Sequence, residues 1–122
     1  MNYFPQILAV DDDLQVLQYV KKTLEPNGYA VKCTTSARQA LAMVEEGQPD
    51  LLILDLNMPK PDGFEVLKAE RSRFPGLRIL VISGHMHSSL LEAATLLGAT
   101  ATLEKPVSAE DLLRTVRHVV GR

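Results

Sequence analysis

Charged and hydroxyl side chains follow several apolar runs of this sequence, at the points where β-strands are expected to end. The runs and the groups that follow them are Ile7–Val10 with Asp11, Asp12 and Asp13, Leu51–Leu54 with Asp55, Leu80–Ile82 with Ser83, and Ala101–Glu104 with Lys105. Because parallel strands end at one edge of a sheet, where open α/β sheets bind ligands, these groups are expected to converge. Carboxylates, a hydroxyl and an ammonium group in one place are suited to phosphate or metal chemistry.

The aspartates predict a site for a divalent cation. If the strand order is 2-1-3-4-5, strands one and three are neighbours, and Asp11, Asp12 and Asp55 lie in a single crevice. Carboxylates this close raise the pKa of one another, so either some stay protonated or a cation neutralises them. Hard oxygen ligands favour Mg²⁺. Lys105 would bring a further positive charge from strand five.

A carboxylate beside Mg²⁺ and a lysine is suited to attack phosphorus and to form an acyl phosphate. Asp55 is the best candidate nucleophile because it ends the central strand, whereas Asp11 and Asp12 are better placed as metal ligands. Ser83 and Lys105 would stabilise the phosphoryl oxygens. Each residue also has an ordinary explanation alone, such as a solvated turn or a surface charge, so the prediction depends on the ordered combination. Asp13, in particular, is a reasonable helix N-cap.

A regular framework is predicted to position these residues. Apolar runs predict strands over residues 6–10, 29–34, 51–54, 78–82 and 100–103. Helical periodicity predicts helices over residues 14–25, 36–46, 63–73, 88–97 and 108–120. The first helix should bury Leu14, Leu17, Val20 and Leu24, and Ser36 and Ser108 should act as N-caps. Strict alternation predicts an α/β fold, a flavodoxin-like doubly wound five-stranded parallel sheet with order 2-1-3-4-5 and five helices.

Composition is that of an ordinary globular protein. The chain has 122 residues, expected to form a single domain over 1–122, with 46% hydrophobic and 23% charged residues. A net charge of −2 without a basic stripe argues against direct binding to nucleic acid or an anionic membrane. No apolar run approaches the ~20 residues needed to span a bilayer. The single cysteine, Cys33, and the lack of a signal peptide favour the cytoplasm.

Taken together, these residues give the chain a family resemblance. From Ile7 to Val120 it resembles the receiver domain of two-component response regulators. The motifs that carry the resemblance are Ile7–Asp13, Leu54–Pro59 with Asp62-Gly63, Val81–Gly84 and Lys105-Pro106. Each is weak alone, but the ordered set is highly specific.

The resemblance implies a phosphoacceptor and its metal ligands. Asp55 would take a phosphoryl group from a phosphohistidine on a sensor histidine kinase or a histidine phosphotransfer protein. Asp12 and Asp55 would bind Mg²⁺ through their side chains, Asn57 through its backbone carbonyl, and Asp11 mainly through water. Such a domain assists its own phosphorylation and dephosphorylation, and is not an enzyme.

The resemblance also implies an output switch. Ser83 would be the switch hydroxyl and Lys105 would contact the phosphoryl group, with a cis peptide bond before Pro106. Phosphorylation would change contacts with a downstream protein that the sequence does not name; a homodimer is a further candidate. Thr102 departs from the family pattern, because receivers usually carry Tyr or Phe three residues before the lysine. A threonine cannot fill an aromatic-sized pocket, so we expect a smaller or different movement over residues 84–97 and 100–103.

Three other functions are compatible with parts of this pattern. A phosphatase of the haloacid-dehalogenase type needs a second Asp two residues after its nucleophile, where this chain has Asn57. A flavodoxin-type FMN carrier needs a phosphate-binding loop after strand one, where three aspartates would repel the phosphate. A degenerate receiver would act as a phosphorylation-independent binding module, and ranks below an active receiver because the acidic residues, Ser83 and Lys105 are all present.

The histidines are expected to be minor features. His85 and His87 could supply metal ligands, but no cysteine or third histidine lies nearby in the sequence. His85 is instead expected at the mouth of the phosphorylation site. His118 is expected on the surface of the last helix.

Overall fold

A computed structural model describes residues 4–58, 63–84 and 88–121. Its sheet contains β1 (Gln6–Val10), β2 (Ala30–Thr34), β3 (Leu51–Asp55), β4 (Ile79–Ser83) and β5 (Ala101–Glu104). Its helices are α1 (Leu14–Leu24), α2 (Ala37–Glu46), α3 (Gly63–Arg73), α4 (Ser88–Leu96) and α5 (Ala109–Val120), with a short 3₁₀ turn, η1 (Glu25–Asn27), after α1. The strands are all parallel in the order β2-β1-β3-β4-β5. The predicted fold class and strand order are therefore confirmed.

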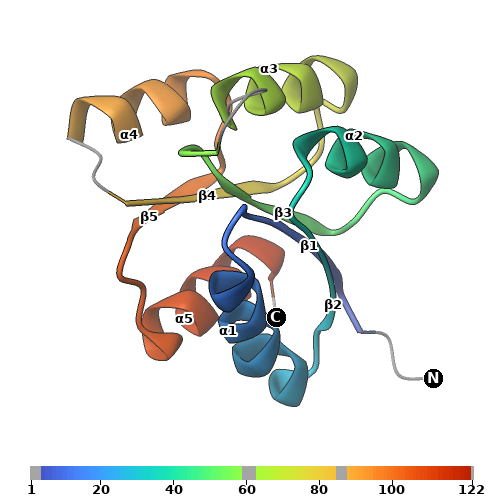
Figure 1. Cartoon of the computed structure of the whole chain (residues 1–122), viewed down its shortest axis with the longest axis vertical. Coiled ribbons are helices and arrows are strands. Elements are labelled where there is room, and N and C mark those ends of the chain that lie inside the picture. The colour runs from blue at the N-terminus through green and yellow to red at the C-terminus, as the bar shows by residue number, and fades with distance from the viewer. Residues whose placement is uncertain (1–3, 59–62, 85–87, 122) are drawn as a thin grey trace.

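Two helical layers cover the sheet (Figure 1). Helices α2, α3 and α4 lie on one face, and α1 and α5 on the other. Side chains alternate along each central strand, so Leu52 and Leu54 face the first layer while Leu51 and Ile53 face the second. Burial on both faces explains why β3 is apolar throughout until Asp55.

The strand register determines which strand ends meet. Val10 pairs with Leu54, so Asp11 and Asp55 are the next residues along two adjacent strands. Ser83, the last residue of β4, pairs with Glu104, so Lys105 follows immediately beyond it. Four residues that are far apart in the sequence therefore reach the same edge of the sheet.

Polar caps and glycines set the ends of the helices. Ser36 accepts a hydrogen bond from the Gln39 amide at 3.1 Å, and Ser108 accepts one from the Asp111 amide at 3.0 Å, as predicted. Gly98 follows α4 with a φ of 111°, in the left-handed region that glycine tolerates. A side chain at Gly98 would also meet the Arg71 guanidinium, since its Cβ would lie 2.6 Å from Arg71 Nε.

The start of α3 lies against the backbone of β3. A Cβ atom on Gly63 would come within 2.3 Å of the Leu56 Cα and 2.5 Å of the Asp55 carbonyl oxygen. The Gly63 amide donates a hydrogen bond to the Leu56 carbonyl at 3.3 Å. Only a residue without a side chain fits here, because backbone atoms cannot move aside cheaply.

One core prediction is wrong, and some predicted boundaries are shifted by one residue. Leu14 was expected on the buried face of α1, but it is 63% exposed. At 3.6 residues per turn it lies about 60° from Leu17, on the side away from Val20 and Leu24, outside the buried stripe. Pro59, Asp62, His85 and His87 lie outside the described residues. Among the residues that are described, none of the helices is long and apolar enough to cross a membrane.

Candidate functional site

Three carboxylates from two strand ends meet at the carboxyl edge of the sheet. Asp11 and Asp12 follow β1, and Asp55 ends β3. One oxygen of each lies within 4.8 Å of the others. Asp11 and Asp55 are buried, at 3% exposure each, whereas Asp12 is exposed. The predicted convergence of the acids is thus present, and their oxygens form a donor set suited to a hard divalent cation.

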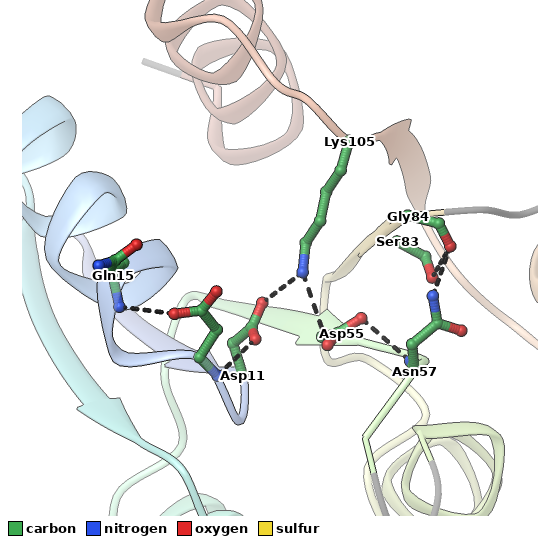
Figure 2. Close-up of polar contacts among 8 residues, drawn as sticks. Asp11, Gln15, Asp55, Asn57, Ser83, Gly84 and Lys105 are labelled. Atoms are coloured by element: carbon green, nitrogen blue, oxygen red, sulfur yellow. Dashed lines mark hydrogen bonds and ion pairs between the residues drawn. The ribbon is translucent and has the colours of Figure 1, made fainter.

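Lys105 supplies a positive charge to this cluster. Its Nζ lies 2.9 Å from an Asp11 oxygen and 3.6 Å from an Asp55 oxygen (Figure 2). Its backbone amide donates to the Ser83 carbonyl at 2.8 Å, which holds the start of the side chain near the end of β4. Burial alone would lower the pKa of Lys105, but its contacts with Asp11 and Asp55 outweigh burial and raise that pKa. The peptide bond between Lys105 and Pro106 is cis, as the resemblance implied.

Burial and neighbouring charges act together on the carboxyl group of Asp55. Burial raises its pKa, and the nearby charges of Asp11 and Asp12 add to the rise. The Asn57 amide, which donates to Asp55 Oδ1 at 3.0 Å, and the Lys105 ammonium both oppose it. The carboxylate is therefore oriented by the chain but stabilised only partly as an anion.

The third aspartate of the acidic run has a structural role. Asp13 is the N-cap of α1, and its Oδ1 accepts a hydrogen bond from the Gln15 amide at 2.9 Å. Its own amide donates to Asp11 Oδ1 at 2.9 Å. This turn directs Asp11 towards Lys105 and Asp55, and separates the cap residue from the cluster.

Ser83 and Asn57 come together at the carbonyl of Gly84. Ser83 is fully buried, and its hydroxyl contacts the Gly84 oxygen at 3.5 Å, which is a weak hydrogen bond. The side-chain amide of Asn57 donates to the same oxygen, as Figure 2 shows. The sequence indicated Asn57 only for its backbone carbonyl. The contact between its side chain and Gly84 had no signal in the sequence, because it joins the loops after two neighbouring strands.

A cavity of about 890 Å³ opens beside the acids. Asp12, Asn57 and Lys105 line its polar end, and Val16, Tyr19, Val20, Val107 and Leu112 line an apolar part between α1 and α5. Tyr19 is 41% exposed and Leu14, on the same helix, is 63% exposed. Sequence reasoning missed this apolar region, because it treated α1 only as a helix that covers the sheet.

Three other residues singled out in the sequence lie apart from the cluster. Cys33 is half-buried in β2, and burial raises the pKa of its thiol, which agrees with an unreactive role. His118 is exposed on α5, as expected. Thr102 is half-buried in β5, whose neighbours Ala101 and Leu103 face the α1–α5 layer. Alternation places Thr102 on the opposite face.

Known proteins resemble this chain in both sequence and structure. Residues 7–117 match the family described as the response regulator receiver domain. Response regulator MprA of Mycobacterium leprae (strain TN) is 39% identical over 117 residues, which are 96% of this chain and 51% of that protein. The chain therefore spans about half the length of the curated relatives it matches.

Solved structures agree with this family. A CheY-like response regulator receiver domain protein from Methanospirillum hungatei JF-1 is 29% identical with a TM-score of 0.92, over 98% of this chain and 95% of that one. Chemotaxis protein CheY4 of Vibrio cholerae is 35% identical with a TM-score of 0.89, over 96% of this chain and 99% of that one. The acidic cluster at the end of β1 and β3, the fold and these matches lead to one conclusion: this chain belongs to the response regulator receiver domain family of two-component signalling.

Proposed function

We propose that Asp55 of this receiver accepts a phosphoryl group from a phosphohistidine of a sensor histidine kinase or a histidine phosphotransfer protein. The observation that carries the proposal is the meeting of three carboxylates from two strands with the ammonium group of Lys105. In this view the domain is a phosphoacceptor that assists its own phosphorylation and dephosphorylation, and is not an enzyme acting on a separate substrate.

The transfer forms one bond and breaks another. An Asp55 carboxylate oxygen bonds to phosphorus while the bond between phosphorus and the donor imidazole nitrogen breaks. The electron pair of the broken bond stays with the nitrogen, which is protonated from solvent. Asp55 has to be ionised to attack, and the Asn57 amide and the Lys105 ammonium favour that form against the effect of burial.

The donor set of the cluster fits Mg²⁺, because it consists of carboxylate oxygens within 4.8 Å of one another. We expect the side chains of Asp12 and Asp55 and the carbonyl of Asn57 to hold the ion, with Asp11 bound through water. The ion, when bound, supplies positive charge that offsets the repulsion between the carboxylates and an incoming phosphoryl group.

Lys105 and Ser83 are suited to contact the transferred group. Lys105 already lies between Asp11 and Asp55, so its ammonium can pair with a phosphoryl oxygen on Asp55 after a small shift. The Ser83 hydroxyl makes only a weak contact with Gly84, and little free energy opposes its turning to a phosphoryl oxygen. A movement of Ser83 would break its contact with Gly84 at the end of β4, and would alter contacts with a downstream protein.

The apolar cavity next to the acids supports the approach of a protein donor. Tyr19 lines the cavity, and Leu14 exposes a large apolar side chain on the same helix. A phosphohistidine helix that packs against this part of α1 would bury Tyr19 while its imidazole reaches Asp55. We therefore propose α1 as part of the surface that the donor protein contacts.

The proposal is tested with a small-molecule phosphoryl donor such as phosphoramidate. We expect intact-mass spectrometry to show one added phosphoryl group on the wild type with Mg²⁺, and far less with EDTA. Asp55→Asn should remain unmodified, whereas Asp111→Asn, which removes an aspartate on α5 outside the cluster, should react like the wild type. Equal labelling of Asp55→Asn and the wild type would refute Asp55 as acceptor, and labelling unaffected by EDTA would refute the role of the metal.

A further inference from the structure

A carboxylic acid is buried in the core, away from the phosphorylation site. Glu70 lies on the inner face of α3, where Val66 and Leu67 are its buried neighbours on the helix. It is 0% exposed, and neither of its carboxyl oxygens has a hydrogen-bond partner among the described residues. A buried carboxylate without a partner is strongly unfavourable, because it has lost its hydration and gained nothing in return.

The charged groups around Glu70 do not compensate for its burial. Helix α3 lies beside α2 on the same face of the sheet (Figure 1). On its own helix Arg73 is the cation whose charge acts on Glu70, but Arg73 forms an ion pair with Glu45 of α2 at 3.0 Å. Both members of that pair are 53% exposed, so their charges are screened by water. Beneath α3, the strands β3 and β4 contribute apolar side chains to the core layer.

These surroundings perturb the acid in a defined direction. Burial raises the pKa of Glu70 to about 7, with Glu45 adding to the rise and Arg73 opposing it. The folded protein therefore binds a proton at Glu70 over the interval between about 4.5 and about 7, where the unfolded chain has already released it.

We propose that Glu70 is a proton-binding site in the hydrophobic core, which makes the α2–α3 side of this receiver sensitive to pH near neutrality. With the proton bound, the side chain is neutral and α3 can keep its inner face against the sheet. When the proton is lost, the carboxylate must reach water, so α3 loosens or the domain loses stability. Proton binding at Glu70 does not require phosphorylation of Asp55, and the two groups lie on different elements, α3 and β3.

The sign of the effect follows from the direction of the shift. A raised carboxyl pKa means that stability falls as pH rises from about 4.5 to about 7, and that the loss is complete above that interval. The corresponding change in the unfolding equilibrium constant is about a hundredfold between about pH 5 and pH 8. Replacement of Glu70 by a neutral isostere should remove this part of the pH dependence.

The test compares unfolding and direct titration. Urea unfolding of the wild type, Glu70→Gln and Glu46→Gln would be followed by circular dichroism from about pH 5 to pH 8. We expect Glu70→Gln to be more stable than the wild type at the alkaline end, with a much flatter pH profile. Glu46→Gln changes an exposed acid on α2 and should keep the profile of the wild type. A Glu70→Gln variant with the same pH profile as the wild type would overturn the proposal.

A second measurement on the wild type decides the matter if Glu70→Gln does not fold. The side-chain carboxyl carbon of Glu70, followed by ¹³C NMR, should titrate with a midpoint near 7, and the amides of α3 should respond with the same midpoint. A Glu70 midpoint at the ordinary value of a glutamate would overturn the proposal.

Discussion

From the charges of the acidic cluster we predict that Asp12→Asn stabilises the folded protein when Mg²⁺ is absent, and reduces the stabilisation that Mg²⁺ provides. Lys105 forms ion pairs with Asp11 and Asp55, whereas Asp12 adds a third negative charge that has no ion pair among the described residues. Asp12→Asn removes that charge and keeps the shape of the side chain. In EDTA the variant should be more stable than the wild type, because two repulsive carboxylate pairs disappear.

The distances in the cluster set the size of this effect. Two unit charges 4.8 Å apart repel by about 3.5 kcal/mol at an effective dielectric constant of ~20, and by about 1 kcal/mol in water. Because Asp12 is exposed, the lower figure is the better guide, and Lys105 offsets part of the repulsion. We therefore expect Asp12→Asn to raise the free energy of unfolding by about 1 kcal/mol in EDTA.

Mg²⁺ should reverse this ranking. A ligand present at a hundredfold excess over its dissociation constant stabilises the folded state by about 2.7 kcal/mol. The wild type should gain this amount when EDTA is replaced by Mg²⁺, and Asp12→Asn should gain much less because it lacks one anionic ligand. Urea unfolding in the two buffers measures both quantities.

Asp13→Asn is the matched control. It removes a charge from the neighbouring residue, and asparagine is as good an N-cap as aspartate. We expect this variant to respond to Mg²⁺ like the wild type. The reasoning would be refuted if Asp12→Asn were less stable than the wild type in EDTA, or if Mg²⁺ stabilised both variants equally.

Three further predictions concern other parts of the chain. Gly98→Ala should lower the free energy of unfolding more in the wild type than in an Arg71→Ala background, because the clash with the Arg71 side chain is absent from that background. The strain of the left-handed φ, about 1 kcal/mol, remains in both. A double-mutant cycle of unfolding free energies measures the difference, and strictly additive effects would contradict the prediction. Ser108→Ala should lower the free energy of unfolding by about 1 kcal/mol through loss of the α5 cap, whereas Ser108→Asp should not. Thr102→Tyr should enlarge the amide chemical-shift changes over β5 on phosphorylation, and an unchanged amplitude would show that this position does not limit the switch.

The order of elements could be predicted because several boundaries have a local signal. Pro26-Asn27-Gly28 marks the end of the first helix, and Ser36 and Ser108 mark the start of two others. The apolar runs are long enough to be strands and too short to be helices. The convergence of Asp11 and Asp55 could also be predicted from the sequence, because adjacent parallel strands bring their carboxyl ends together.

Other features depend on tertiary distances and could not be read from local patterns. Leu14 has the spacing of a buried residue, yet it lies outside the buried stripe of α1. Glu70 would be placed in solvent by any rule based on residue type, and its burial follows only from how α3 lies on the sheet. The side-chain amide of Asn57 donates to the Gly84 carbonyl because the residues that follow β3 and β4 lie close together in the folded chain.

The contact between Gly63 and the backbone of Asp55 and Leu56 couples the position of α3 to the proposed phosphoacceptor. Because backbone atoms meet there, a rotation or sliding of α3 at Gly63 would press on the peptide that carries the Asp55 carboxyl group. A drug-like molecule or a protein that wedges against the outer side of this helix could therefore tune the chemistry from a distance. Selection of variants at such remote positions would be a route to receivers with longer or shorter signalling lifetimes.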